Sequence, residues 1–210
     1  MEKSNIDEKI KLLTGSGMWH TQEVEGLPSV HLSDGPHGLR KQEEKERQNN
    51  VSLVSTCYPT ASALACSWDV TAAERLGRAV AKEAWNADVS VLLGPGINMK
   101  RSPLCGRNFE YFSEDPFLAG RLGAAYVSAA QGEDVAVSLK HFAANNQETN
   151  RQTANSQIDE RALREIYLSA FEYVVKTARP ATVMASYNRL NGYYACENRH
   201  LLTEILREEW

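Results

Sequence analysis

The chain has 210 residues, enough for one domain or for part of a larger one. Hydrophobic residues make up 42% and charged residues 24%, as in ordinary globular proteins, and the formal net charge of −4 offers no basic surface for nucleic acid. No apolar stretch is long enough to span a bilayer, and the polar start Met1–Glu8 lacks the apolar middle of a signal peptide. We therefore expect a cytoplasmic protein with no nucleic-acid and no membrane partner.

Helical and strand-like patterns alternate along the chain. A short amphipathic helix is predicted over residues 4–14, where Ser4 and Asp7 resemble a capping box. Apolar runs typical of buried parallel strands follow at 27–32, 89–93, 135–139 and 182–185. Four further helices are predicted: at 69–85, from Asp115-Pro116 to Gly132, at 160–178 with Asp159 as its cap, and from about Arg199 onward. A solvated loop is predicted at 40–50 and a turn at Asn191-Gly192.

One helix followed by four strand–helix pairs predicts parallel strands with right-handed crossovers. The fold class is therefore α/β, the first half of a TIM-type (β/α)8 barrel truncated after about four βα units, since a complete barrel needs roughly 250 residues. We expect the chain to be an N-terminal fragment that needs the remainder of its own polypeptide to complete the barrel. Because strand edges and apolar helix faces would be uncovered, we expect the fragment to self-associate or to be poorly soluble.

Polar and charged clusters follow the predicted strands, where the active sites of β/α barrels lie. These clusters are at 33–40, 106–110, 140–142 and 186–188. Because the carboxyl ends of parallel strands meet at one edge of a sheet, we expect the four clusters to form a functional site there.

Asp34, Arg40 and Arg107 are candidates for hydrogen bonds to a polar ligand. A carboxylate at the sharp turn of Asp34 can accept hydrogen bonds from two neighbouring sugar hydroxyls, although an Asx turn or a helix cap explains it equally well. Either arginine could donate to hydroxyls or carboxylates, or be a surface charge. The residues after Arg107 favour a packed loop in which Glu110 is an internal partner, whereas Glu148 is expected to be a loop or cap residue.

Lys140 and His141 form the sharpest local signal. Adjacent strand residues point to opposite faces, so both reach one ligand only if the strand ends and turns there; the alternative is one inward and one outward side chain. A buried lysine suits hydrogen bonding or Schiff-base formation. At the end of the fourth strand, Tyr187 can present its ring edge and hydroxyl to a polar ligand, whereas Met184 on its own fits core packing better.

No motif for a cofactor or a metal is present. The chain lacks a P-loop, a dinucleotide fingerprint and an H-E-x-x-H motif. Its cysteines, Cys57, Cys66, Cys105 and Cys196, contain no C-x-x-C pair and are expected to be reduced structural thiols. We therefore expect no cofactor and no metal ion.

Taken in order, the motifs span nearly the whole chain. They are SDGPHGLR at 33–40, YPT at 58–60, WD at 68–69, GPGINMKRSP at 94–103, GRNFEYFSEDP at 106–116, KHF at 140–142, DER at 159–161 and MASYN at 184–188. Together they resemble the N-terminal part of the barrel domain of glycoside hydrolase family 3 enzymes of the β-glucosidase type. The resemblance implies a barrel domain of which residues 1–210 are the N-terminal portion.

The resemblance also implies which residues bind substrate, a small glycoside or an oligosaccharide. In the family, the subsite for the terminal sugar is lined by residues matching Asp34, Arg40, Arg107, Lys140, His141, Met184 and Tyr187. Asp34 is then expected to bind the distal sugar hydroxyls. Arg107, Lys140 and His141 would hold the ring, and Tyr187 would flank the reacting carbon.

The two catalytic carboxylates of the family have no match here. The family nucleophile is an aspartate after the next strand, expected beyond Trp210, and the acid/base is commonly a glutamate of the following domain. A retaining glycosidase needs two carboxylates about 5 Å apart. We therefore expect a parent protein that is a retaining β-glucosidase and an isolated chain that is inactive. A Schiff-base aldolase-type barrel using Lys140, or a non-catalytic sugar-binding fragment, are the alternatives.

Overall fold

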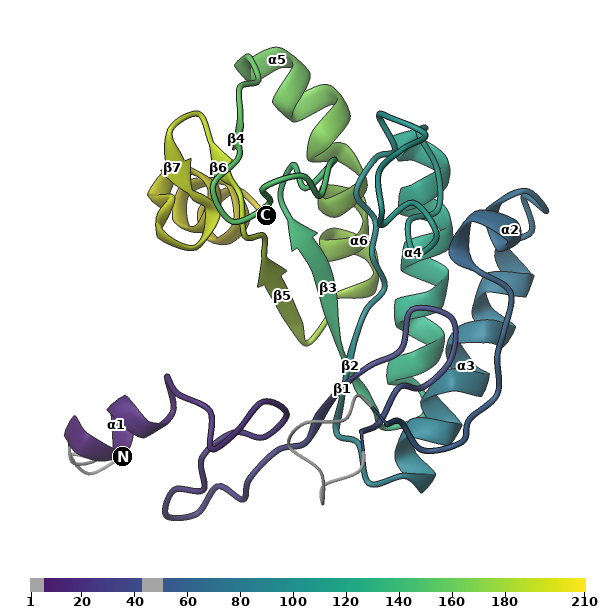
Figure 1. The fold of residues 1–210 in the computed structure, drawn as a ribbon, viewed down its shortest axis with the longest axis vertical. Coiled ribbons are helices and arrows are strands. Elements are labelled where there is room, and N and C mark those ends of the chain that lie inside the picture. The colour runs from purple at the N-terminus through teal and green to yellow at the C-terminus, as the bar shows by residue number, and fades with distance from the viewer. Residues whose placement is uncertain (1–5, 43–50) are drawn as a thin grey trace.

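Four parallel strands form the central sheet of the computed structural model, which describes residues 6–42 and 51–210. In the sheet order they are β1 (Leu32–Asp34), β2 (Val91–Leu93), β3 (Ala136–Phe142) and β5 (Thr182–Ala185). Each pairs in parallel with the next (Figure 1). This is the strand order of consecutive βα units, so the predicted α/β fold with half of a barrel sheet is confirmed.

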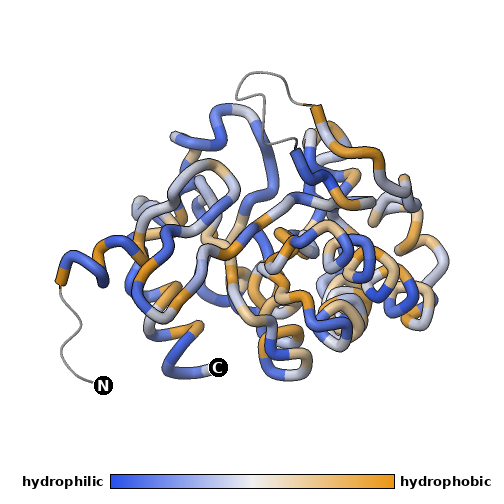
Figure 2. The backbone as a smooth tube through the Cα atoms, turned by 90° about the horizontal axis from the view of Figure 1, so that it is seen from below, coloured by the Kyte–Doolittle hydropathy of each residue, from blue (hydrophilic) through white to orange (hydrophobic). Residues whose placement is uncertain are grey.

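Three long helices lie side by side against the sheet (Figure 1). They are α3 (Val70–Asn86), α4 (Pro116–Gln131) and α6 (Ser169–Ala178). Polar and apolar stretches alternate along the helical coils in Figure 2, and α3 and α6 each bury one face. By contrast, α4 lies between these two helices and is buried nearly all round, with every residue from 122 to 127 buried. At Gly77, α3 approaches α4 so closely that a Cβ would lie 2.5 Å from the Tyr126 carbonyl oxygen.

The predicted helix caps are confirmed. Asp69 Oδ1 accepts a hydrogen bond from Thr71 N at 2.8 Å at the start of α3. Asp115 Oδ1 accepts one from Phe117 N at 2.9 Å at the start of α4. Each carboxylate satisfies a backbone N–H that has no partner within its helix, which fixes where the helix begins.

The prediction of one continuous helix over residues 160–178 is wrong in the middle of that range. Asp159 caps α5 (Glu160–Ala162), but a π-helical segment, Leu163–Tyr167, separates α5 from α6. Leu168 N donates to Leu163 O at 2.8 Å, a bond across five residues that displaces the following side chains around the axis. The apolar side chain of Ile166 is therefore exposed.

The boundaries of three strands also differ from the prediction. The first strand begins at Leu32 rather than at 27 because the preceding residues pair with the N-terminal segment: Thr21 N donates to Val30 O at 3.0 Å. The second strand, β2, begins two residues after its predicted start at 89, and β3 ends three residues after its predicted end at 139. A short helix, α2 (Ala61–Ala65), was missed; the Thr60 hydroxyl oxygen accepts a hydrogen bond from Ala63 N at its start.

The remaining elements are short. The predicted N-terminal helix is α1 (Ile6–Lys11); Ser4 and most of the loop expected at 40–50 lie outside the described residues. A second sheet contains β4, β6 and β7, and Asn191-Gly192 forms the predicted turn between β6 and β7 with positive φ at both residues. The other bounds are β4 (Asn155–Ser156), β6 (Arg189–Leu190), β7 (Tyr193–Tyr194), a 3-10 turn Ala195–Glu197 and a π-helix His200–Glu209.

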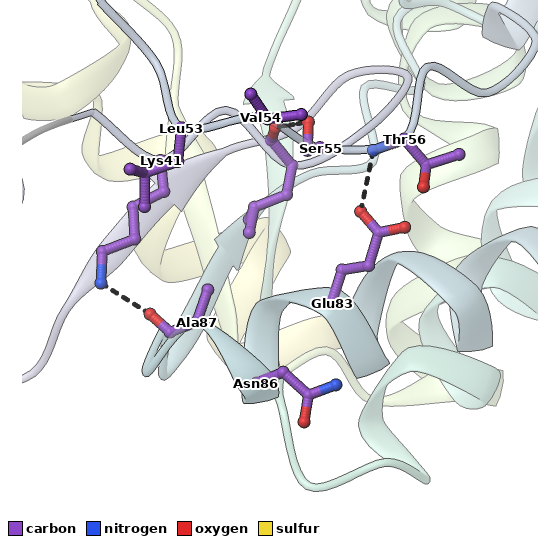
Figure 3. Close-up of a pocket in the computed structure, with 9 residues that line it drawn as sticks. Lys41, Leu53, Val54, Ser55, Thr56, Glu83, Asn86 and Ala87 are labelled. Atoms are coloured by element: carbon purple, nitrogen blue, oxygen red, sulfur yellow. Dashed lines mark hydrogen bonds between the residues drawn. The ribbon is translucent and has the colours of Figure 1, made fainter.

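A cavity of about 460 Å³ lies between residues 53–56 and the end of α3 (Figure 3). Lys41 Nζ donates to Ala87 O at 2.6 Å, and Thr56 N donates to Glu83 Oε2 at 3.3 Å. Partial burial opposes the charge of Glu83, but hydrogen bonds from Thr56 and Tyr58 outweigh it and lower its pKa. These contacts attach the segment after β1 to α3. Over the described residues, no helix is long and apolar enough to cross a membrane.

Candidate functional site

A second cavity, of about 650 Å³, brings together all seven predicted site residues. They come from β1 and the turn after it, from the loop between β2 and α4, from β3, and from β5 and the turn after it. They are Asp34, Arg40, Arg107, Lys140, His141, Met184 and Tyr187. The cavity therefore lies where the carboxyl ends of the parallel strands meet, the position of active sites in β/α barrels.

Lys140 and His141 both line this cavity, which excludes the alternative with one inward and one outward side chain. The pairing of β3 with β5 shifts register between Leu139 and Phe142, and such an irregularity redirects side chains. Asn98 holds this stretch by two hydrogen bonds: its Nδ2 donates to His141 O at 2.8 Å, and its Oδ1 accepts from His141 N at 2.7 Å.

A buried cluster of charges forms one wall of the cavity. Lys140 Nζ lies 3.1 Å from Glu110 Oε2 and 3.5 Å from Asp34 Oδ1. The other Glu110 oxygen accepts a hydrogen bond from Arg107. Glu110 is 4% exposed and Lys140 is 3% exposed, so each charge depends on the other for compensation. Glu110 is thus the internal partner that the sequence predicts.

Glu148 lies in the loop after β3, as expected, and it extends the cluster toward the rim. Its Oε1 lies 3.1 Å from Arg107 Nε, and its Oε2 accepts a hydrogen bond from Arg151 at 2.8 Å. Burial opposes the charge of Arg107, but the carboxylates of Glu110 and Glu148 outweigh it and raise the pKa of Arg107. The guanidinium therefore stays charged and in a fixed place.

His141 is neutral and has one defined tautomer. Burial, then the positive charges of Lys140 and Arg107, lower its pKa from 6.5 to about 2. His141 Nε2 lies 3.1 Å from Arg107 Nη1 and Nδ1 lies 2.9 Å from the Tyr111 hydroxyl. Because a guanidinium only donates, Nε2 is the acceptor and Nδ1 carries the proton. Tyr111 is fully buried, which fixes the orientation of the imidazole.

The remaining predicted residues lie at the more open side of the cavity. The Asp34 side chain is 30% exposed, so it can accept hydrogen bonds from a ligand. Arg40 is exposed, and its backbone N–H closes the turn by donating to Asp34 O at 2.7 Å. Met184 is half-buried rather than a full core residue. Tyr187 is exposed, and the Arg151 guanidinium lies 4.9 Å from its ring centre.

Several lining residues lie outside the predicted clusters and were not predicted. They are Met18, Trp19, Leu93, Glu148 and Arg151. Arg151 and Glu148 belong to the polar stretch after the third strand, a signal that could have found them. Met18 and Trp19 precede the first strand, and only the folded chain shows that they reach the site.

The cavity is lined by hydrogen-bond donors and acceptors whose charges are compensated within the protein. Such a lining is suited chemically to an uncharged polar ligand. Within residues 6–42 and 51–210, no group of three or more His, Cys, Asp or Glu side chains is placed to hold a metal ion.

Comparison with known families identifies this arrangement. The family pattern described as "Glycosyl hydrolase family 3 N terminal domain" matches residues 36–210. The chain belongs to glycosyl hydrolase family 3. It is similar to β-glucosidase 3B from Thermotoga neapolitana in complex with glucose, with a TM-score of 0.92 and 42% identity over 99% of this chain and 31% of that structure. The predicted resemblance and the barrel fold are both confirmed.

Two relatives within the family differ in their named activities. A thermostable β-glucosidase B from Acetivibrio thermocellus is 53% identical over 100% of this chain, and an exo-α-(1→6)-L-arabinopyranosidase from Bifidobacterium longum is 49% identical over 98%. The chain spans 28% of the length of each relative.

Replacing Glu110 by glutamine should destabilise the protein by about 3–5 kcal/mol, because it leaves the buried Lys140 and Arg107 without their shared counter-charge. Glu165→Gln, which breaks an exposed ion pair with Arg161, is the matched control and should cost less than about 1 kcal/mol. Urea unfolding measures both. Equal losses for the two variants would show that the buried cluster does not hold the fold together.

The low pKa of His141 predicts a loss of stability in acid. Below pH 6.5 an unfolded histidine binds a proton that native His141 does not, so its contribution to stability is present above pH 6.5 and is lost as the pH falls. The free energy of unfolding should fall by up to about 1.4 kcal/mol per pH unit from this group. His141→Gln should remove that slope between pH 7 and pH 5.

His200 provides a control of opposite sign. A hydrogen bond to Glu204 raises the pKa of His200, so its contribution to stability is present at low pH and is lost as the pH rises. His200→Gln should therefore make the loss of stability in acid steeper, whereas His141→Gln should make it shallower. Unfolding curves at pH 7 and pH 5 give both slopes, and an unchanged slope in His141→Gln would contradict the account.

Proposed function

We propose that residues 1–210 are the N-terminal portion of the barrel domain of a retaining β-glucosidase, which releases terminal β-D-glucosyl residues from small glycosides or oligosaccharides. The observation that carries the proposal is the convergence of all seven predicted residues on one cavity at the strand ends. Support comes from relatives named β-glucosidase and from the similarity to a glucose-bound structure.

The geometry suggests a division of work among the side chains. Asp34, partly exposed at the mouth, accepts hydrogen bonds from distal hydroxyls of the terminal sugar. Lys140 and Arg107 donate to ring hydroxyls from the charged wall, and His141 packs beside them in its neutral form. Met184 and Tyr187 line the cavity at the end of β5 and just after it. Tyr187 is proposed to flank the reacting carbon. This half of the site binds the sugar and orients it.

The bond-breaking carboxylates are proposed to lie outside residues 1–210. A retaining enzyme needs a nucleophile and an acid/base about 5 Å apart across the scissile bond. The three carboxylates lining the cavity each have a cation within 3.5 Å: Asp34 and Glu110 beside Lys140, and Glu148 beside Arg151. Their pairing supports a binding role, and the isolated chain is therefore proposed to be inactive.

The Schiff-base alternative receives no support from the site. An amine nucleophile needs a free lone pair to attack a carbonyl. Lys140 Nζ instead lies between Glu110 and Asp34, at 3.1 and 3.5 Å. A sugar-binding role without turnover remains the proposal for residues 1–210 by themselves.

The proposal is tested by measuring aryl β-glucoside hydrolysis with a polypeptide that contains residues 1–210 and is as long as the β-glucosidase relatives. We expect turnover by that protein, none by residues 1–210, and a loss in kcat/KM of roughly 10²-fold or more in Asp34→Asn or Lys140→Met, because each removes a charged hydrogen-bonding group from the sugar. Lys176→Met, at an exposed position of α6, should keep full activity. No turnover across aryl glycosides, or an unaltered Asp34→Asn variant, would refute the proposal.

A further inference from the structure

We propose that a third cavity, called here the outer cavity, binds a small organic anion through Lys100 and Arg101. It measures about 420 Å³ and lies between α2, the loop that follows β2 and the start of α4. In the fold, α2 lies beside α4 (Figure 1). None of the described residues that line the outer cavity also lines the candidate site, so this inference goes beyond the proposed function and does not depend on it.

Two cations without a carboxylate partner carry the first step. Lys100 is half-buried, and Arg101 lies next to it in the lining. Lys100 Nζ donates to the neutral hydroxyl of Ser62. The Arg101 guanidinium lies 5.9 Å from the centre of the Tyr167 ring. Over the described residues neither cation is in an ion pair, so both charges can attract an anion from outside the chain.

The burial of Lys100 is not balanced by a negative charge of the protein. Burial lowers the pKa of Lys100, and the opposing contribution comes from the Cys66 thiol rather than from a carboxylate. In the candidate site, by contrast, the carboxylates of Glu110 and Glu148 raise the pKa of Arg107. A phosphate or carboxylate group of a ligand would give Lys100 the counter-charge that Arg107 receives from its own chain.

Two serine hydroxyls add hydrogen-bond donors to the lining. Ser102 Oγ accepts a hydrogen bond from Leu104 N at 3.2 Å, and Ser113 Oγ accepts one from Asp115 N at 3.0 Å. These bonds fix both oxygens, and neither hydroxyl hydrogen has an acceptor among the described residues. Lys100 N donates to Ser113 O at 3.1 Å, so backbone pairing holds the two sides of the loop together. The cations and the hydroxyls can therefore donate to one anionic group.

The rest of the lining favours an anion that carries an apolar group. Trp68, Phe112 and Leu118 give the outer cavity an apolar side. Trp68 is 73% exposed, so an aromatic ring or a short alkyl group attached to the anion would cover its indole. Glu114 is the only carboxylate among the lining residues, and it is exposed. Two cations against one carboxylate leave the lining positively charged, although Glu114 opposes an anion.

The inference is tested by calorimetry with phenyl phosphate and with benzoate, in a buffer free of phosphate and carboxylate. The protein is a polypeptide that contains residues 1–210 and is as long as the β-glucosidase relatives. We expect a Kd of about 1 mM or below for at least one of the two, and the tighter one identifies the anionic group as phosphate or carboxylate. Benzyl alcohol, which carries no charge, should bind at least about tenfold more weakly.

Variants of the lining should change the affinity in opposite directions. Lys100→Met should weaken binding by about tenfold, and Lys100→Arg should restore it, because the anion needs the charge. Glu114→Gln should tighten binding by about threefold, because it removes the opposing charge. Trp68→Ala should weaken the binding of phenyl phosphate but not that of inorganic phosphate. Lys82→Met is the matched control, since Lys82 is an exposed cation of α3 outside the lining, and its affinity should equal that of the wild type.

Three results would overturn the inference. The first is a wild-type protein that binds neither anion. The second is equal binding by the wild type, Lys100→Met and Glu114→Gln; the exposed position of Glu114 keeps this comparison valid even where Lys100→Met fails to fold. The third is complete displacement of the anion by glucose, which would place it in the candidate site. Hydrolysis of glycosides is not a readout here, so each of these results leaves the proposed function standing.

Discussion

A buried carboxylate between two cations is the interaction on which the site depends. Glu110 receives Lys140 from β3 and Arg107 from its own loop, and all three charges are largely removed from water. Such charges are stable only in fixed geometry with their partners, because an unpaired buried charge costs several kcal/mol. The cluster therefore fixes the loop to the strand and sets the positions of the groups that meet a ligand.

The sheet makes this cluster possible. Gly96, which follows β2, bridges to both Lys140 and Tyr111, and a Cβ there would lie 2.9 Å from the Tyr111 ring. This close approach brings the loop of Arg107 and Glu110 against β3. Tyr111 in turn holds His141, whose neutral ring accepts from Arg107. Parallel pairing, one glycine and one ion cluster thus join the loop after β2 to β3 in a single wall.

The fold was largely predictable because its signals are local. Helices begin after the caps Asp69, Asp115 and Asp159, and Asn191-Gly192 forms a turn. Each of these signals depends on contacts within a few residues along the chain. The π-helical segment after Ala162 was not predictable, since helical periodicity presupposes bonds across four residues. The strand-end rule predicted clusters at one edge of the sheet, and the family resemblance selected the seven residues, which all line one cavity. Trp19 reaches this cavity through pairing with β1, a long-range contact that no local pattern reports.

The account depends most on the claim that the paired charges of this wall bind a sugar without losing their own partners. This claim is tested directly by a crystal structure, with bound glucose, of a polypeptide that contains residues 1–210 and is as long as the β-glucosidase relatives. We predict sugar hydroxyls within hydrogen-bonding distance of Asp34 and Lys140, with Glu110 still contacting both Lys140 and Arg107. Glucose bound elsewhere, or Glu110 separated from Lys140 by the sugar, would contradict the account.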